Sequence, residues 1–159
     1  VKGQGISAYD PRTFKGFGVT YASSTMGADH TAGPATPGRG GLDPSKKSEV
    51  DEPEGKAELS LDLQIMIAAI DSTGFCFFVG PQPPMMKTIA DLLKARYGWD
   101  LTAEDIIEMG REILRRERRF NEMAGFTKAD NRLPSFFLEE PLPPFGRVFD
   151  VKYLSLIHI

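Results

Sequence analysis

The sequence predicts a mainly α-helical protein with long irregular loops. Three stretches, 56–72, 83–98 and 102–125, combine helix-like apolar patterns with residues that begin or end helices. The segments between and around them are rich in glycine and proline, which interrupt regular elements. With 159 residues, 41% apolar and 26% charged, the chain has the composition of a globular protein with one core of ordinary size.

The first third of the chain has weaker patterns. A short helix is expected to begin near Pro11 with Asp10 as its cap, because proline suits a first helical turn. The stretch FGVTYASST, residues 17–25, fits a strand or a short helix equally well. Residues 34–55 carry proline, glycine and charge with almost nothing apolar, which predicts a surface loop or linker.

The first long helix is expected to begin at about Lys56. Its apolar residues cover most faces, which is typical of a buried helix, and Gly74 supplies a stop. A second helix is expected to start at the prolines of residues 83–84 and to end at Gly98. Its apolar face would be formed by Met86, Ile89 and Leu93.

The third helix has the clearest signals. Thr102 is a good N-cap, and Leu101 and Ile106 can form a hydrophobic staple across it. One apolar face is expected from Ile106, Met109, Ile113 and Phe120. Gly125 ends the helix, and Phe120 and Phe126 are expected in the core, with Asn121 fixing a loop by hydrogen bonding. The prolines that follow forbid long helices, so the aromatic residues there predict a segment wrapped on the core.

Charge limits the classes of partner. Arginines and glutamates alternate along residues 108–122, and Glu112 can pair with Arg116, which predicts a solvated, ion-paired face. A net charge of -3 argues against nucleic acid or an anionic membrane as the main partner. The sequence shows no hydrophobic leader and no spanning run, and a single cysteine fits a reducing compartment. We therefore expect a cytoplasmic protein.

The one cysteine, Cys76, lies between Phe75 and Phe77 just after an expected helix end. The pattern alone favours a buried, small hydrophobic side chain. A catalytic thiol is disfavoured, because the dipole at a helix C-terminus has the wrong sign to stabilise a thiolate. A soft metal ligand stays open, since a bound metal removes the thiol proton.

Two further polar residues are candidates for a site. For Asp71 the pattern favours a local turn role, in which its carboxylate is hydrogen-bonded to Ser72, Thr73 or loop amides. The alternative is that the carboxylate accepts N–H donors from a bound heterocycle. His30 lies in the glycine-rich loop MGADHTAG, where a hydrogen-bonded turn residue is the ordinary interpretation. Its alternative roles are proton transfer and metal contact.

Four motifs together resemble one family. YDPR, GVTYASSTMGADHTAG, DSTGFC and RRFNEMAGFTKADNRLPSFFLEEPLPP follow one another as in the C-terminal part of tungsten-containing aldehyde:ferredoxin oxidoreductases. The resemblance covers about residues 3–150. It implies the multihelical C-terminal domains of that family, with residues 1–153 as a partial helical cofactor-binding region.

The resemblance also implies a site. The family holds tungsten, or sometimes molybdenum, on two pterin cofactors of the molybdopterin type, with a [4Fe-4S] cluster nearby. By match, Asp71 would accept N–H groups of a pterin, Gly74 would shape the turn, and Cys76 would ligate the cluster. His30 would be the catalytic residue that assists the substrate carbonyl or its proton transfer. Phe75 replaces the leucine usual in the family, which alters the shape of the pocket.

The implied function is that of the whole enzyme. It would oxidise aldehydes to carboxylates with ferredoxin as electron acceptor, and the oligomeric state is left open, a homo-oligomer included. The remaining cluster cysteines lie upstream in the family, so this chain alone is expected to be inactive. The alternatives are a related enzyme that reduces an acyl-CoA or an aromatic ring, and a helical interaction domain with no cofactor.

The last six residues, LSLIHI, follow the preceding sequence abruptly. They match the translation of an adapter used in sequencing libraries. We therefore expect residues 154–159 to be read-through and exclude His158 as a candidate for function.

Overall fold

The computed structural model describes residues 1–45 and 49–152. Within them the chain forms α-helices and short 3-10 turns without a named β-strand, which confirms the mainly helical prediction. The α-helices are α1 (Lys15–Ser23), α2 (Lys56–Asp71), α3 (Pro83–Tyr97), α4 (Ala103–Met123) and α5 (Phe136–Glu139). The 3-10 turns are η1 (Phe77–Val79) and η2 (Lys128–Asp130). None of these helices is long and apolar enough to cross a membrane.

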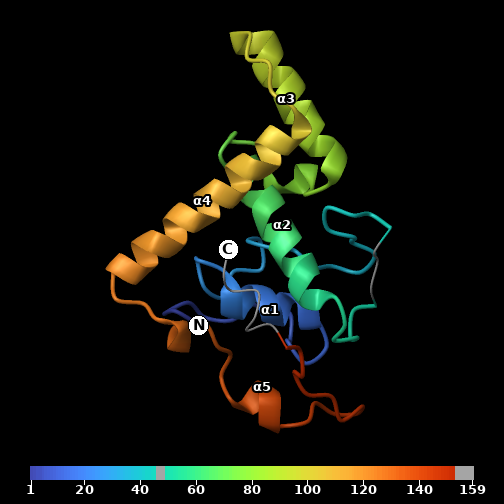
Figure 1. The fold of residues 1–159 in the computed structure, drawn as a ribbon. Coiled ribbons are helices and arrows are strands. Elements are labelled where there is room, and N and C mark those ends of the chain that lie inside the picture. Colours follow the sequence, from blue (N-terminus) through green and yellow to red (C-terminus); the bar gives the residue numbers. More distant parts are fainter. Residues whose placement is uncertain (46–48, 153–159) are drawn as a thin grey trace.

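Helix α2 is the centre of the molecule and packs against α1, α3 and α4 (Figure 1). It is buried along most of its length, as its apolar pattern predicts. The crossing with α4 is close at Gly110, where a Cβ atom would lie 2.2 Å from the carbonyl oxygen of Ile65. The core around α2 consists mainly of Leu63, Met66, Ile70, Met86, Ile89 and Ile106.

Helix α1 is buried at all nine residues. The helix includes residues 17–23 of the ambiguous stretch FGVTYASST, and it begins at Lys15 rather than near Pro11. Asp10 caps a turn instead, because its carboxylate accepts the Arg12 N–H at 2.8 Å and its carbonyl accepts the N–H of Phe14 at 2.8 Å. A second core cluster surrounds α1 and includes Phe17, Tyr21, Phe137, Phe149 and Val151.

The predicted ends of α3 and α4 are confirmed. Gly98 follows α3 in the left-handed conformation with φ 74°, which a glycine adopts without strain. Thr102 caps α4, where its side chain accepts the Asp105 N–H while Asp105 accepts the Thr102 N–H. The ion pair between Glu112 and Arg116 is present at 2.9 Å.

The prediction of two core phenylalanines is wrong. Phe120 is 71% exposed and Phe126 is 37% exposed. The buried residues of α4 are Ile106, Gly110 and Leu114. The last turns of α4 extend beyond α2 (Figure 1), and the buried residues of α4 all lie before them. Asn121 does fix a loop, since its Nδ2 donates to the Thr25 carbonyl at 2.8 Å.

Two other segments connect these helices. The described parts of residues 34–55 hold turns and no helix, and they lie against α2, where the Leu42 N–H donates to Asp62 at 3.0 Å. A role as linker stays a prediction. In the C-terminal segment, Phe137 and Phe149 are buried, as expected of a chain that wraps on the core, whereas Phe145 is exposed. Residues 154–159 lie outside the described residues.

Candidate cofactor site

The turn after α2 presents two of the predicted site residues. Asp71 is the last residue of α2, and its carbonyl accepts the Gly74 N–H at 3.1 Å. The Thr73 hydroxyl donates to the Ile70 carbonyl at 2.6 Å, which closes the helix end. Gly74 has φ 75°, a conformation that glycine adopts without strain. The backbone then runs outward to Cys76.

The Asp71 carboxylate has no hydrogen bond or ion pair within the part of the chain that the structure describes. The Ser72 hydroxyl donates to the Ala68 carbonyl rather than to Asp71, so the local turn role favoured by the sequence pattern is wrong. Partial burial raises the pKa of Asp71, and the charges of Asp29 and Glu117 raise it further. A carboxylate without a donor beside other carboxylates is suited to accept N–H groups from a ligand.

Cys76 is exposed, which contradicts the interpretation as a buried hydrophobic residue. It occupies the N-cap of η1, and its carbonyl accepts the Val79 N–H at 3.0 Å. The turn lies beyond the end of α2, and the neighbouring rings are exposed too: Phe75 at 38% and Phe78 at 89%. The thiol is therefore accessible to a partner from outside the described chain.

His30 lies in the loop between α1 and α2. Its ring is 5.4 Å from the ring of Tyr9, and its Nδ1 is 3.9 Å from the Asp29 carboxylate. Asp29 is held in place because it accepts both the N–H and the hydroxyl of Thr31. The imidazole is 42% exposed, so it can exchange protons with a ligand or with solvent.

A pocket of about 250 Å³ lies between the 24–32 loop, α2 and α4, with Asp71 on its wall. Sequence reasoning missed two of its other lining residues, Gln64 and Glu117. Gln64 donates to Ser23 and Ser60, and its Oε1 is buried without a partner among the described residues. A glutamine between the apolar residues Leu63 and Ile65, in a helix predicted to be buried, is the signal that could have found it.

The predicted residues are brought together only in part. Asp29, the neighbour of His30, acts on the charge of Asp71, so the His30 loop and the end of α2 share one region. Neither His30 nor Cys76 lines the pocket beside Asp71. The shared element is the exposed turn, which carries Asp71 and Cys76 five residues apart.

The donor set fits part of a larger cofactor site. No group of three or more His, Cys, Asp and Glu side chains suited to a metal ion occurs within residues 1–45 and 49–152. The chain has one cysteine, whereas a [4Fe-4S] cluster usually takes four thiolates. An accessible thiol and an unpaired carboxylate on one turn fit one cluster ligand and one acceptor for a heterocycle.

The described residues form a helical protein whose exposed turn after α2 carries a carboxylate and a thiol. The family described as aldehyde ferredoxin oxidoreductase, domains 2 and 3, matches residues 1–157. The chain therefore belongs to the aldehyde ferredoxin oxidoreductase family.

Several curated proteins are similar to the chain. It is 38% identical over 149 residues to the tungsten-containing aldehyde ferredoxin oxidoreductase of Pyrococcus furiosus, covering 90% of this chain and 24% of that protein. The corresponding protein of Thermococcus kodakarensis is 36% identical over 149 residues, with the same coverage. The chain thus spans about a quarter of the length of these relatives.

Proposed function

We propose that the chain is the part of an aldehyde-oxidising enzyme that completes its cofactor site. The observation that carries the proposal is the exposed turn after α2, which holds Asp71 and Cys76 without partners inside a chain of this family. The substrate is an aldehyde, the product is a carboxylate, and ferredoxin accepts the electrons. The reaction takes place in the cytoplasm.

Three residues would hold the cofactors. The Asp71 carboxylate accepts N–H groups of a pterin, and Gly74 turns the backbone between Asp71 and Cys76. The Cys76 thiolate ligates a [4Fe-4S] cluster, whose other thiolates come from elsewhere in the full-length protein. When bound, the tungsten bis-pterin and the cluster supply the two-electron redox chemistry and pass electrons on singly.

His30 handles a proton in this proposal. Oxidation of an aldehyde by water, RCHO + H₂O → RCOO⁻ + 3 H⁺ + 2 e⁻, releases three protons and two electrons, which reduce two ferredoxins. A half-exposed imidazole beside Asp29 can accept one of these protons at a ring nitrogen and return it to solvent. When the His30 ring is protonated, the negative charge of the Asp29 carboxylate attracts it and keeps it in place.

The first test measures metal content rather than activity. The full-length protein is purified without oxygen from tungstate-supplied cells, alongside Cys76→Ala and Cys76→Ser. We expect about one tungsten and roughly four iron atoms per chain, with the iron reduced in both variants. For Asp71→Asn we expect the opposite result, in which the tungsten content falls and the iron content does not.

The outcome that would sink the proposal is a metal-free native protein from a host that loads a known tungsten enzyme. A protein of that kind would be a helical interaction domain. Unchanged iron in both Cys76 variants would remove Cys76 from the cluster while leaving the pterin assignment to Asp71 standing.

A further inference from the structure

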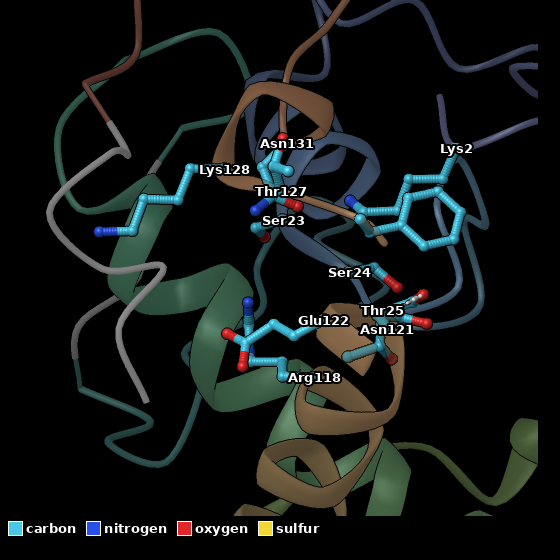
Figure 2. A pocket seen from close by; sticks show the side chains of 11 residues that line it. Lys2, Ser23, Ser24, Thr25, Arg118, Asn121, Glu122, Thr127, Lys128 and Asn131 are labelled. Carbon is cyan, nitrogen blue, oxygen red and sulfur yellow. Dashed lines mark hydrogen bonds between the residues drawn. The ribbon is translucent and has the colours of Figure 1, made fainter. Parts of the chain in front are cut away.

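A second pocket, of about 140 Å³, lies on the other side of Ser24 and Thr25 from Asp71. Figure 2 shows its wall, which is built by the N-terminal segment, residues 23–25, the end of α4 and the segment 126–131. The N-terminal segment, residues 23–25 and the run from the end of α4 to residue 131 are separate in the sequence, so the fold assembles the pocket. The Asn121 hydrogen bond to Thr25 ties two of its walls together.

Lys2 and Arg118 are two of the three cations that line this pocket, the third being Lys128. In the described part of the chain, no carboxylate lies within ion-pair distance of Lys2 or Arg118. Burial, and then the charge of Arg118, lowers the pKa of Lys2 to about 8. Burial likewise lowers the pKa of Arg118. Two like charges held together in a partly buried site destabilise each other unless an anion joins them.

The nearby carboxylates do not fill this role. Asp130 is engaged by Thr127, whose N–H and hydroxyl donate to it at 2.7 Å and 3.0 Å. Glu122 lies at the rim of the pocket and is exposed. The charge of Glu122 raises the pKa of Arg118, although the two side chains form no ion pair.

Hydrogen-bond donors are also left over. The Arg118 Nε is buried and has no partner among the described residues. The Lys2 ammonium uses one donor on the Ala22 carbonyl at 3.0 Å and has two more. Buried donors are normally satisfied, so an orphaned guanidinium N–H indicates an acceptor that belongs there.

We propose that this pocket binds a small oxyanion, a phosphate or carboxylate group, between Lys2 and Arg118. A volume of about 140 Å³ holds roughly five water-sized groups, which is the size of phosphate. Arg118 supplies planar guanidinium donors and Lys2 a point charge, the usual combination for such an anion. The site is separate from the exposed turn of Asp71 and Cys76, and does not depend on the proposed function.

The test titrates the full-length protein with inorganic phosphate and, in a second arm, with acetate, and measures binding by calorimetry. Arg118→Gln removes the buried donor. Arg119→Gln is its matched control, because it makes the same charge change at the adjacent, exposed position that does not line the pocket. Glu122→Gln removes the negative charge at the rim of the pocket. Its effect on anion binding tests the proposal even if Arg118→Gln does not fold.

We expect saturable binding of one anion, weakened about tenfold or more in Arg118→Gln and changed less than about twofold in Arg119→Gln. Glu122→Gln should tighten binding by roughly two- to fivefold, since a repulsive charge is removed. The stronger of the two arms identifies phosphate or carboxylate. Absence of saturable binding to both anions, or equal weakening by Arg118→Gln and Arg119→Gln, would overturn the proposal.

Discussion

The carboxylate of Asp71 lies at the C-terminus of α2, near Asp29 and Glu117. The helix dipole and both neighbours disfavour its ionised form in the absence of a ligand. A ligand that brings N–H donors to this position removes the repulsion as it binds. Asp71 therefore lowers the stability of the chain at neutral pH, and in the proposed function the N–H donors of a bound pterin would offset that loss.

The effect on stability has a definite sign. The pKa of Asp71 in the folded chain is raised, so the folded state binds the proton more tightly than the unfolded state. The wild type therefore loses stability as pH rises through the pKa of Asp71. Asp71→Asn should be more stable than wild type at pH 7, by about 0.5 kcal/mol at most because the group is exposed. Near pH 3 the difference should vanish.

Urea unfolding of the chain at the two pH values measures this difference. Glu54→Gln is the control, because Glu54 is an exposed carboxylate outside the site. A midpoint for Asp71→Asn at or below that of wild type at pH 7 would contradict the prediction.

At the scale of elements, the crossing of α2 and α4 depends on one residue without a side chain. Gly110 faces the Ile65 backbone so closely that any Cβ would overlap its carbonyl oxygen. The two helices can pack at this distance because the glycine leaves room. The pocket beside Asp71 is lined by these same two helices, so the crossing also sets its width.

Gly110→Ala should destabilise the chain by about 1–3 kcal/mol, as overpacking of a core does. The change would otherwise favour the helix by roughly 1 kcal/mol, so a loss of stability reports the crowding. Gly5→Ala is the matched control, because no atom lies within 4 Å of its Cβ position. The comparison is made by urea unfolding, and equal shifts in the two variants would refute a tight crossing.

The elements differ in how far the sequence predicts them. α2, α3 and α4 are predictable because their caps and apolar patterns are local signals. The start of α1 is not, since that helix is buried by residues 149–151 and its Lys15 pairs with Asp150 at 2.5 Å. Tertiary contacts of this kind override local propensity.

The same distinction applies to the site. The turn at Gly74 is a local feature and is predictable from the sequence. The exposure of Cys76 is not, because it depends on whether a distant segment of the chain covers the turn. The pattern around a cysteine between aromatic residues does not contain that information. Glu117 was assigned to a solvated charged face, and its place beside Asp71 follows from the crossing of α2 and α4.

At the scale of the molecule, several large apolar side chains are exposed. Phe78, Met123, Phe145 and Phe120 are 89%, 81%, 75% and 71% exposed. Phe78 lies on the same turn as Cys76, and the chain spans about a quarter of its relatives. On this turn Phe75, Phe78 and Val79 are all exposed, and a cluster of exposed apolar side chains marks a site of contact with other protein segments.

The chain on its own should therefore self-associate, and Phe78→Ser should reduce the association more than Met123→Ser does. Light scattering over a range of concentrations measures the mean mass of each protein. The Met123 variant is the control for loss of an exposed apolar group far from the turn. A monomeric wild type, or the same change in both variants, would show that the turn is not the contact surface.

The complete burial of α1 has a consequence for how the protein is made. A helix of nine residues has little stability on its own. The core that buries α1 includes Phe149, from the C-terminal segment. From Ser23 to Phe149 the ribosome must add 149 − 23 = 126 residues. At 5–20 residues per second this takes roughly 6–25 s. During that time the apolar rings of α1 lack the C-terminal part of their core, so they stay accessible in the nascent chain until residues 149–151 are made.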